Sequence, residues 1–246
     1  MKKYFFVFFI VGIVFSCKSP LECDFSGDKT TVIKALPDFD TVEVNVGIDL
    51  QIVDVDENSI NITADKDIIQ NISYEIINRK LVLTNHTSCL IQNKDAVAKI
   101  ILEVDDIQKI IANTDLKISA ANTWQFNHLD LLSENYNEGT NNIANIDIKL
   151  DIQQLNIIAN GNSNIKITGS CHDLFVGFYG GNPRLEANNL TVDHISVFQR
   201  SNADMWLKPL QKITGDLFGY GDIYLYHNPP VINIIKHDTG HIYFVN

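Results

Sequence analysis

The chain has 246 residues and a formal net charge of −11, with 45% hydrophobic and 20% charged residues. The apolar fraction excludes a disordered chain, and a mean hydropathy of zero excludes a protein with several membrane spans. An acidic surface repels phosphate groups, so the composition argues against nucleic acid as a partner. Isoleucine and asparagine are abundant, with 34 and 26 copies, whereas only three arginines are present.

Residues 1–16 are predicted to be a signal peptide. Two lysines follow the first methionine, and residues 4–15 form an almost unbroken apolar run that is too short to cross a bilayer as a helix. A small residue then directly precedes Cys17, which resembles the lipobox of bacterial lipoproteins, where the signal is cut before the cysteine and the cysteine is acylated. We therefore expect lipidation at Cys17. An ordinary secretory signal with a chance cysteine is the alternative, and the bulky Phe15 favours it.

Lipidation at Cys17 predicts a protein of the cell envelope, attached to a membrane by buried acyl chains. The outer membrane is the expected location, and both a periplasmic and a surface-facing orientation stay open. Removal of residues 1–16 deletes two lysines and lowers the net charge from −11 to −13. Residues 17–38 are expected to form a tether and the first strand, and residues 39–246 one folded domain.

Three cysteines remain after the predicted cleavage site. Cys23 and Cys89 lie in polar, loop-like segments, and the oxidising compartment permits a disulfide between them. Cys171 follows a Gly-Ser turn and is expected to be a small buried residue. No CxxC motif occurs, so the sequence indicates neither a zinc ribbon nor a thioredoxin-like redox site.

The sequence from Asp40 onward alternates with a period of two. Apolar side chains at every second position from Val42 to Ile52 are typical of a half-buried strand. Shorter stretches of the same kind follow at residues 60–62, 81–83 and 100–104. No long segment keeps the spacing of a helix, and residues 64–72 have room for one or two helical turns. The sequence therefore predicts an all-β protein.

After residue 106 the strands follow a longer repeat. Each unit has a short apolar strand, a turn rich in Asn, Gly, Ser or Asp, and a second short strand. The first apolar residue after each turn recurs at intervals of 18 to 20, at Ile165, Leu185, Met205, Ile223 and Ile242. Such a repeat predicts a β-solenoid, whose successive coils stack in parallel. We expect coils of about 20 residues over residues 107–246 with the strands of residues 39–106 packed onto them; an antiparallel β-sandwich is the alternative.

The turns of these units contain asparagine and glycine at matching positions. Asparagine tolerates left-handed turn conformations and can hydrogen-bond to its copy in the adjacent coil. Glycine adopts a positive φ without a steric penalty. We therefore expect asparagine ladders along the turns, and a positive φ at Gly161, Gly181, Gly221 and Gly240.

Three segments carry a resemblance to a known family. They are residues 39–44 (FDTVEV), 160–165 (NGNSNI) and 219–229 (GYGDIYLYHNP). These segments resemble the head GIN domain family, also named "putative autotransporter adhesin" or DUF2807, and the resemblance extends over residues 39–246. It implies a right-handed parallel β-helix related to pectin-lyase-like solenoids, in a lipoprotein of Bacteroidetes-type bacteria. It also implies adhesion or interaction at the cell envelope, with no catalytic residues.

The resemblance leaves the binding surface open. The turns at residues 112–116 and 201–205 lack the glycines of the family's pattern, which weakens a binding role for the turns themselves. We therefore expect a face of the coils to bind or scaffold a ligand, and that ligand to be a glycan or a protein. The oligomeric state stays open.

A carbohydrate-active β-helix enzyme is the alternative class, because two carboxylates on one face could act on a polysaccharide. Asp204, Asp222 and Asp238 lie near corresponding turn positions of successive coils, and stacked turns about 4.8 Å apart would align them along one acidic edge. No lysine or arginine occurs at the matching positions, and aspartate in such turns usually caps backbone N–H groups. We therefore expect a non-catalytic protein and keep a polysaccharide lyase or hydrolase as the alternative.

Three histidines near the C-terminus, His227, His237 and His241, have a spacing that imitates a metal site. Their neighbours Asp238 and Thr239 fit a solvated turn better. We therefore predict no metal ion. No Gly-rich loop precedes a helix, so no nucleotide or other cofactor is expected.

Aromatic residues recur from coil to coil. Phe178, Phe198 and Phe218 are each 20 residues apart, which predicts one stacked column. An interior ladder is one interpretation, because large side chains fill such coils. An outward column that stacks on sugar rings or on a protein partner is the other. This column and the edge of Asp204, Asp222 and Asp238 form the candidate binding surface.

Overall fold

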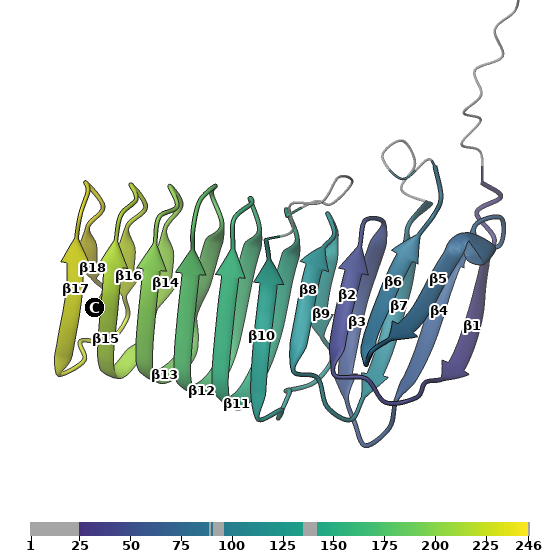
Figure 1. The fold of residues 1–246 in the computed structure, drawn as a ribbon, viewed down its shortest axis with the longest axis horizontal. Coiled ribbons are helices and arrows are strands. Elements are labelled where there is room, and N and C mark those ends of the chain that lie inside the picture. The colour runs from purple at the N-terminus through teal and green to yellow at the C-terminus, as the bar shows by residue number, and fades with distance from the viewer. Residues whose placement is uncertain (1–24, 89, 91–95, 135–141, 246) are drawn as a thin grey trace, which may run out of the picture.

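The computed structural model describes residues 25–88, 90, 96–134 and 142–245. In these residues eighteen strands form one continuous sheet, and Ile69–Asn71 form the 3-10 turn η1. Figure 1 shows the sheet folded into two layers along an elongated molecule, a front sheet and a rear sheet. The expected all-β class is confirmed. The described part of the chain contains no helix that is long and apolar enough to cross a membrane.

The strands of the front sheet follow one another along the long axis of the molecule (Figure 1). Starting at the N-terminal end they are β5 (Ile72–Ile77), β6 (Lys80–Asn85), β2 (Thr41–Asn45), β8 (Lys109–Asn113), β10 (His128–Ser133), the second halves of β11 (Asn145–Ala159), β12 (Asn164–Phe178) and β13 (Arg184–Gln199), β15 (Pro209–Leu217) and β17 (Val231–Lys236). Neighbouring strands are parallel except for the pair β5 and β6.

The rear sheet follows the same order of coils along the long axis of the molecule. Its strands are β1 (Lys29–Ala35), β4 (Ser59–Asp65), β7 (Ala98–Val104), β3 (Ile48–Asp54), β9 (Lys117–Ala120), the first halves of β11, β12 and β13, β14 (Met205–Leu207), β16 (Ile223–Leu225) and β18 (Ile242–Phe244). Only β4 pairs antiparallel with its neighbours, β1 and β7.

The long strands β11, β12 and β13 cross from the rear sheet to the front sheet without a break. Their side chains alternate between buried and exposed, but two successive exposed residues interrupt the alternation, as Gln153 and Gln154 do between the buried Ile152 and Leu155. The extra exposed residue lets the chain turn a corner while the apolar side chains face inward on both sides of it. We name this bend, at the bottom of Figure 1, the lower corner.

Apolar columns fill the space between the two sheets. The five marker residues of the repeat are in register: Ile165, Leu185, Met205, Ile223 and Ile242. The first four are buried, and only Ile242 at the end of the column is partly exposed. Each such buried side chain contributes about 1.5–3 kcal/mol. The predicted intervals are confirmed, and they mark the hydrophobic ladder that holds the coils together.

The strands of residues 39–106 are arranged differently from the expectation. The sequence predicts that they pack onto the coils, but they extend the same two sheets, because β2 pairs with β8 and β3 pairs with β9. On their other side β2 and β3 pair with β6 and β7, so a later segment lies outside an earlier one. A coil of two strands has open backbone groups on both edges, and this pairing satisfies them.

The turns combine side-chain ladders with close backbone approach. Asn182 donates a hydrogen bond from Nδ2 to Oδ1 of Asn162 in the preceding coil, at 3.2 Å, as expected for an asparagine ladder. Of the four glycines expected at positive φ, Gly181 has one, at 72°. The expectation is wrong for Gly161, Gly221 and Gly240. At Gly221 glycine is needed for another reason, because a Cβ atom would collide with the carbonyl oxygen of Ala203.

Of the cysteines discussed above, only Cys171 lies within the described residues. The signal peptide of residues 1–16, the lipidation site Cys17 and the cysteines Cys23 and Cys89 lie outside the described residues. Cys171 is a free, buried thiol, as expected. Burial raises its pKa to about 12, so the thiol stays protonated and acts as a small apolar side chain.

Candidate functional site

The predicted aromatic column is present in part. Phe198 and Phe218 lie side by side on the outside of the front sheet with ring centroids 5.2 Å apart, but Phe178 is buried in the core. Tyr179 takes the third place, with its ring 5.1 Å from that of Phe198. At the other end the ring of His237 stacks on Phe218 at 4.0 Å. We name Tyr179, Phe198, Phe218 and His237 the front column.

The strand register explains why Phe178 points inward. Phe178 is paired with Gln199, whereas Phe198 is paired with Gly177. Successive side chains of a strand point to opposite faces, so a shift of one residue exchanges inside and outside. The interval of 20 residues identifies successive coils correctly, but the step between these two strands is 21 residues. Spacing in the sequence does not reveal that difference.

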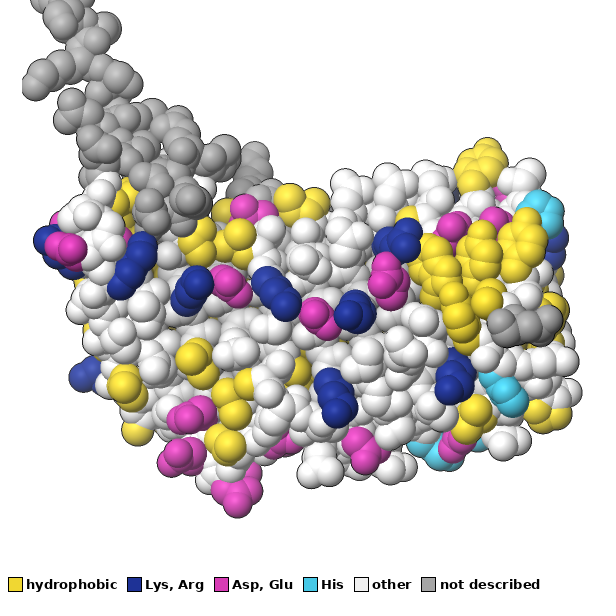
Figure 2. Space-filling model, turned by 180° about the vertical axis from the view of Figure 1, so that it is seen from behind, with side chains coloured by type: hydrophobic (Ala, Val, Ile, Leu, Met, Phe, Trp, Pro, Cys, Tyr) yellow, Lys and Arg dark blue, Asp and Glu magenta, His cyan; other side chains and the backbone are white. Residues whose placement is uncertain are grey.

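A second aromatic row lies on the outside of the rear sheet. Trp206, Tyr224 and Tyr243 occupy the same outward position in β14, β16 and β18. The rings of Trp206 and Tyr224 are 5.5 Å apart, and those of Tyr224 and Tyr243 are 5.2 Å apart, with nearly parallel planes. Offset stacking at these distances leaves part of each ring uncovered. We name these three residues the rear column, and Figure 2 shows hydrophobic side chains gathered over this end of the rear face.

Charged side chains border the rear column. The guanidinium carbon of Arg184, in the preceding coil, lies 3.9 Å from the ring centroid of Trp206, which is a cation–π contact. Its Nε is 3.0 Å from Oε1 of Glu186, so the guanidinium is held in place. Figure 2 shows a line of basic and acidic side chains that leads along the rear face to the hydrophobic patch. Loss of hydration and nearby carboxylates raise the pKa of Tyr224, which keeps its hydroxyl neutral.

The predicted acidic edge is formed by two of its three members. Oδ1 of Asp204 accepts a hydrogen bond from the backbone N–H of Asp222 at 2.9 Å, and Oδ1 of Asp222 accepts one from the N–H of His241 at 2.7 Å. Asp238 lies outside this row, and its Oδ1 accepts the N–H of Thr239 in its own turn at 2.8 Å. These carboxylates join adjacent coils or close a turn, which is the structural role expected for such aspartates.

Two of the three C-terminal histidines each pair with one carboxylate. Nε2 of His237 is 2.7 Å from Oδ1 of Asp216, and Nδ1 of His241 is 3.6 Å from Oδ1 of Asp222. His227 is exposed. In the described part of the chain one group of three metal-ligating side chains lies close together, and it includes none of these histidines. That group lies at the lower corner, where no site is predicted from the sequence.

A shallow groove crosses the front sheet beside the lower corner. Its volume is about 380 Å³, and outward residues of β11, β12, β13 and β15 line it. The lining includes Asn156, Ser196 and Thr214 together with Phe175. Small-molecule sites are usually enclosed and mainly apolar, so this groove does not have the character of one. The rear column departs more clearly from an ordinary polar surface.

These features define a class, namely an all-β protein of stacked parallel coils with rows of aromatic side chains on its surface. The chain belongs to the family described as "Putative auto-transporter adhesin, head GIN domain" (DUF2807), whose model matches residues 38–229. The resemblance predicted from the sequence is thereby confirmed. A search of curated proteins finds no match.

Solved structures of bacterial proteins share the fold. A putative adhesin from Bacteroides fragilis has a TM-score of 0.78 and 19% identity, over 89% of this chain and 98% of the other. A putative adhesin from Parabacteroides distasonis has a TM-score of 0.63 and 15% identity, over 89% and 98%. A protein of the same species titled as a putative lipid binding protein has a TM-score of 0.63 and 13% identity, over 90% and 98%. At these identities the likeness concerns the fold alone.

Proposed function

We propose that the protein is a non-catalytic, adhesin-like binding protein of the cell envelope and that its rear column binds a glycan. The observation that carries the proposal is the row of three stacked rings, Trp206, Tyr224 and Tyr243, on the outside of the rear sheet. The family and the adhesin names of the solved relatives agree with a binding role.

The chemistry of the row suits a sugar chain. A pyranose ring has a flat C–H face that packs against an aromatic ring, and its hydroxyl groups need polar partners at the side. Arg184 and Glu186 provide such partners beside Trp206. The rings follow one another every 5.2 to 5.5 Å, so successive sugars of an extended chain would each meet a ring.

The shape of the row favours a glycan over a protein. A stable protein interface buries about 800 Å² on each partner and has a broad apolar centre. The rear column has one ring on each strand, and Arg184 and Glu186 of the preceding coil lie beside Trp206. A narrow, extended ligand fits this surface better.

We also propose a class for the fold and a location for the protein. We place the stacked coils in the right-handed, pectin-lyase-like class of β-solenoids; the parallel ladders of β10 to β18 support this assignment. We also propose that acylated Cys17 anchors the chain to the outer membrane, and the lipobox-like residues before it support this. Mass spectrometry of the membrane fraction tests the anchor: acyl chains on Cys17 support it, and an unmodified cysteine or a chain cut elsewhere contradicts it.

Affinity electrophoresis of the full chain tests the binding role. A panel of neutral and acidic polysaccharides is cast in native gels, and the wild type is compared with the variant Trp206→Ala/Tyr224→Ala. We expect at least one polysaccharide to retard the wild type. Loss of two stacked rings removes about 1–3 kcal/mol, so the affinity of the variant falls roughly tenfold or more.

The matched control is Phe218→Ala, which removes a ring from the front column on the opposite face. This variant should keep full retardation. An equal loss of retardation in both variants, or no retardation of the wild type by any polysaccharide, would contradict the proposal. Binding of a protein alone would also contradict it.

The enzyme alternative has its own test. The carboxylates of Asp204 and Asp222 are occupied by backbone N–H groups, which argues against their use as catalytic acids. Incubation with the same polysaccharides, with and without calcium, should release no new reducing ends or unsaturated products. Turnover that is lost in Asp204→Asn would overturn the non-catalytic assignment.

A further inference from the structure

The lower corner places two outward-facing residues of each coil side by side with those of the next coil. In chain order these pairs are Gln153–Gln154, His172–Asp173, Asp193–His194 and Gln211–Lys212. The strand register aligns the second members, Gln154, Asp173, His194 and Lys212. The middle two coils carry histidine and aspartate in opposite order, so each histidine lies next to an aspartate of the other coil.

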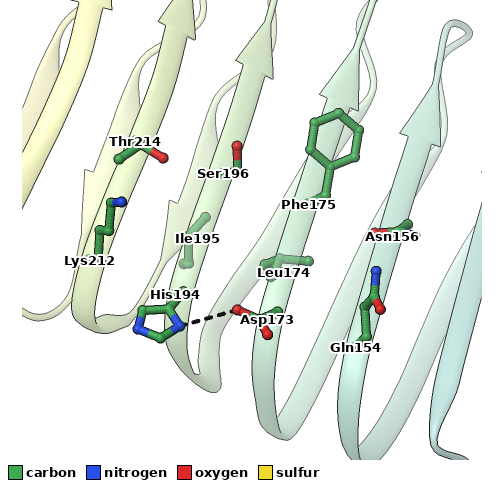
Figure 3. Close-up of a pocket in the computed structure, with 10 residues that line it drawn as sticks. All are labelled: Gln154, Asn156, Asp173, Leu174, Phe175, His194, Ile195, Ser196, Lys212 and Thr214. Carbon is green, nitrogen blue, oxygen red and sulfur yellow. Dashed lines mark hydrogen bonds and ion pairs between the residues drawn. The ribbon is translucent and has the colours of Figure 1, made fainter.

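The side chains of this cluster converge on one carboxylate. Nδ1 of His172 is 2.8 Å from Oδ2 of Asp173, and Nδ1 of His194 is 3.1 Å from Oδ1 of the same group. The two imidazole rings are 5.1 Å apart and nearly perpendicular. Nε2 of His172 lies 3.8 Å from Oδ2 of Asp193. Figure 3 shows Asp173 and His194 joined at the lower rim of the front groove.

From this geometry we propose that His172, Asp173 and His194 form a surface site for a divalent transition-metal ion of the zinc class. One ligand atom from each residue lies within 4.8 Å of the others. Zinc bonds are about 2.0–2.2 Å long, so a small rotation of these exposed side chains brings all three atoms onto one ion. Two imidazoles and a carboxylate favour zinc, copper or nickel over calcium and magnesium, which prefer oxygen ligands.

The surroundings leave room for an ion with free coordination positions. Asp193 lies beside His172 and adds negative charge to the cluster. Gln154 lies on the other side, and its amide is uncharged. Lys212 of the next coil aligns with His194, and Figure 3 shows its ammonium group directed along its strand toward Thr214, away from the ring of His194. The groove beside the site is open, so solvent or a ligand oxygen can complete the coordination.

Isothermal titration of the metal-free full chain with ZnCl₂ tests the site. The wild type is compared with the double variant His172→Asn/His194→Asn, and thermal melting shows whether both are folded. We expect one equivalent of zinc that the double variant lacks, with at least the roughly 10–100-fold weakening seen when a metal site loses a supporting partner. Cobalt(II) should give a d–d absorption band in the wild type only.

The matched control is His128→Asn, which removes a histidine that pairs with a single carboxylate, at 2.8 Å from Asp130. This variant should bind zinc like the wild type. Equal zinc binding by the wild type and the double variant would overturn the proposal, as would calcium or magnesium displacing the zinc at equal concentration. A wild type that binds no zinc would overturn it as well.

Discussion

The two ends of the stack are closed in different ways. At the N-terminal end the outermost strands β1 and β5 run antiparallel to their neighbours, and β1 carries Lys29 and Lys34. At the C-terminal end β17 and β18 keep the parallel direction of the stack. Their exposed apolar side chains are Val231, Ile232, Ile235, Tyr243 and Phe244. Lysine side chains on an edge strand oppose further pairing, although Ile33 of β1 and Ile77 of β5 are also exposed, whereas exposed apolar side chains do not oppose it. The N-terminal end therefore closes the fold, and the C-terminal end keeps an open parallel edge.

Polar contacts of a buried carboxylate explain how the N-terminal end is fixed. Asp65 accepts hydrogen bonds from the backbone N–H of Gly27 at 2.7 Å and of Asp67 at 2.9 Å, and from the hydroxyl of Ser26 at 3.2 Å. These bonds, first that from Asp67, lower the pKa of Asp65. At the C-terminal end the outermost contacts are instead stacked rings, those of Tyr224 on Tyr243 among them.

Replacing a ring inside the coils should cost more stability than replacing a ring on the aromatic surface. Phe178→Ala removes a buried ring from the core and should destabilise the protein by about 3–5 kcal/mol. Phe198→Ala removes a ring of the front column, and we expect a loss of about 1 kcal/mol. Urea denaturation measures both. Equal losses would mean that Phe198 belongs to the core and that the front column is not a surface feature.

A second pair of variants compares the interior with the C-terminal edge. Ile223→Ala creates a cavity in the central ladder and should cost about 2–5 kcal/mol. Ile235→Ala alters an exposed side chain of β17 and should change the stability by no more than about 0.5 kcal/mol. A large loss at Ile235 in the same denaturation experiment would show that the C-terminal edge is covered in solution.

A smaller, pH-dependent effect tests the closure of the N-terminal end. Because the pKa of Asp65 is lowered in the folded state, its carboxylate stabilises the fold above the pKa of the unfolded chain. This stabilisation disappears as the pH falls through the folded-state pKa. Asp65→Asn should therefore melt at a lower temperature than the wild type at neutral pH, and the difference should shrink in acid. Asp238→Asn is the control, because its carboxylate only closes a local turn. If the difference between the two melting temperatures does not change with pH, the ionised carboxylate of Asp65 does not stabilise the fold.

Several features of the fold are predictable from the sequence because they depend on periodicity. The alternation from Val42 to Ile52 appears in the structure as β2 and β3, and the interval of the markers Ile165 to Ile242 gives the register of the interior ladder. The place of β6 and β7 outside β2 and β3 is not predictable in this way, because pairing between distant segments leaves no local pattern.

The surface sites are harder to predict, because a shift of one residue in the pairing of two strands exchanges the side chains that face inward and outward. Phe178 pairs with Gln199, 21 residues later, and therefore points inward. Tyr179 takes its predicted place in the front column. The histidine cluster has a weak signal in the sequence, namely His172–Asp173 and the reversed Asp193–His194 one coil later. That signal has meaning only once both pairs are known to lie at the same corner.

Hydrogen exchange with a bound polysaccharide tests the central claim, that the rear face at the C-terminal end is the binding surface. The full chain is exchanged with and without a polysaccharide that retards it in native gels, and peptides are compared strand by strand. We expect slower exchange in β14, β16 and β18, which carry Trp206, Tyr224 and Tyr243. Protection confined to β1, β4 and β5 at the N-terminal end, or to the front sheet, would contradict it.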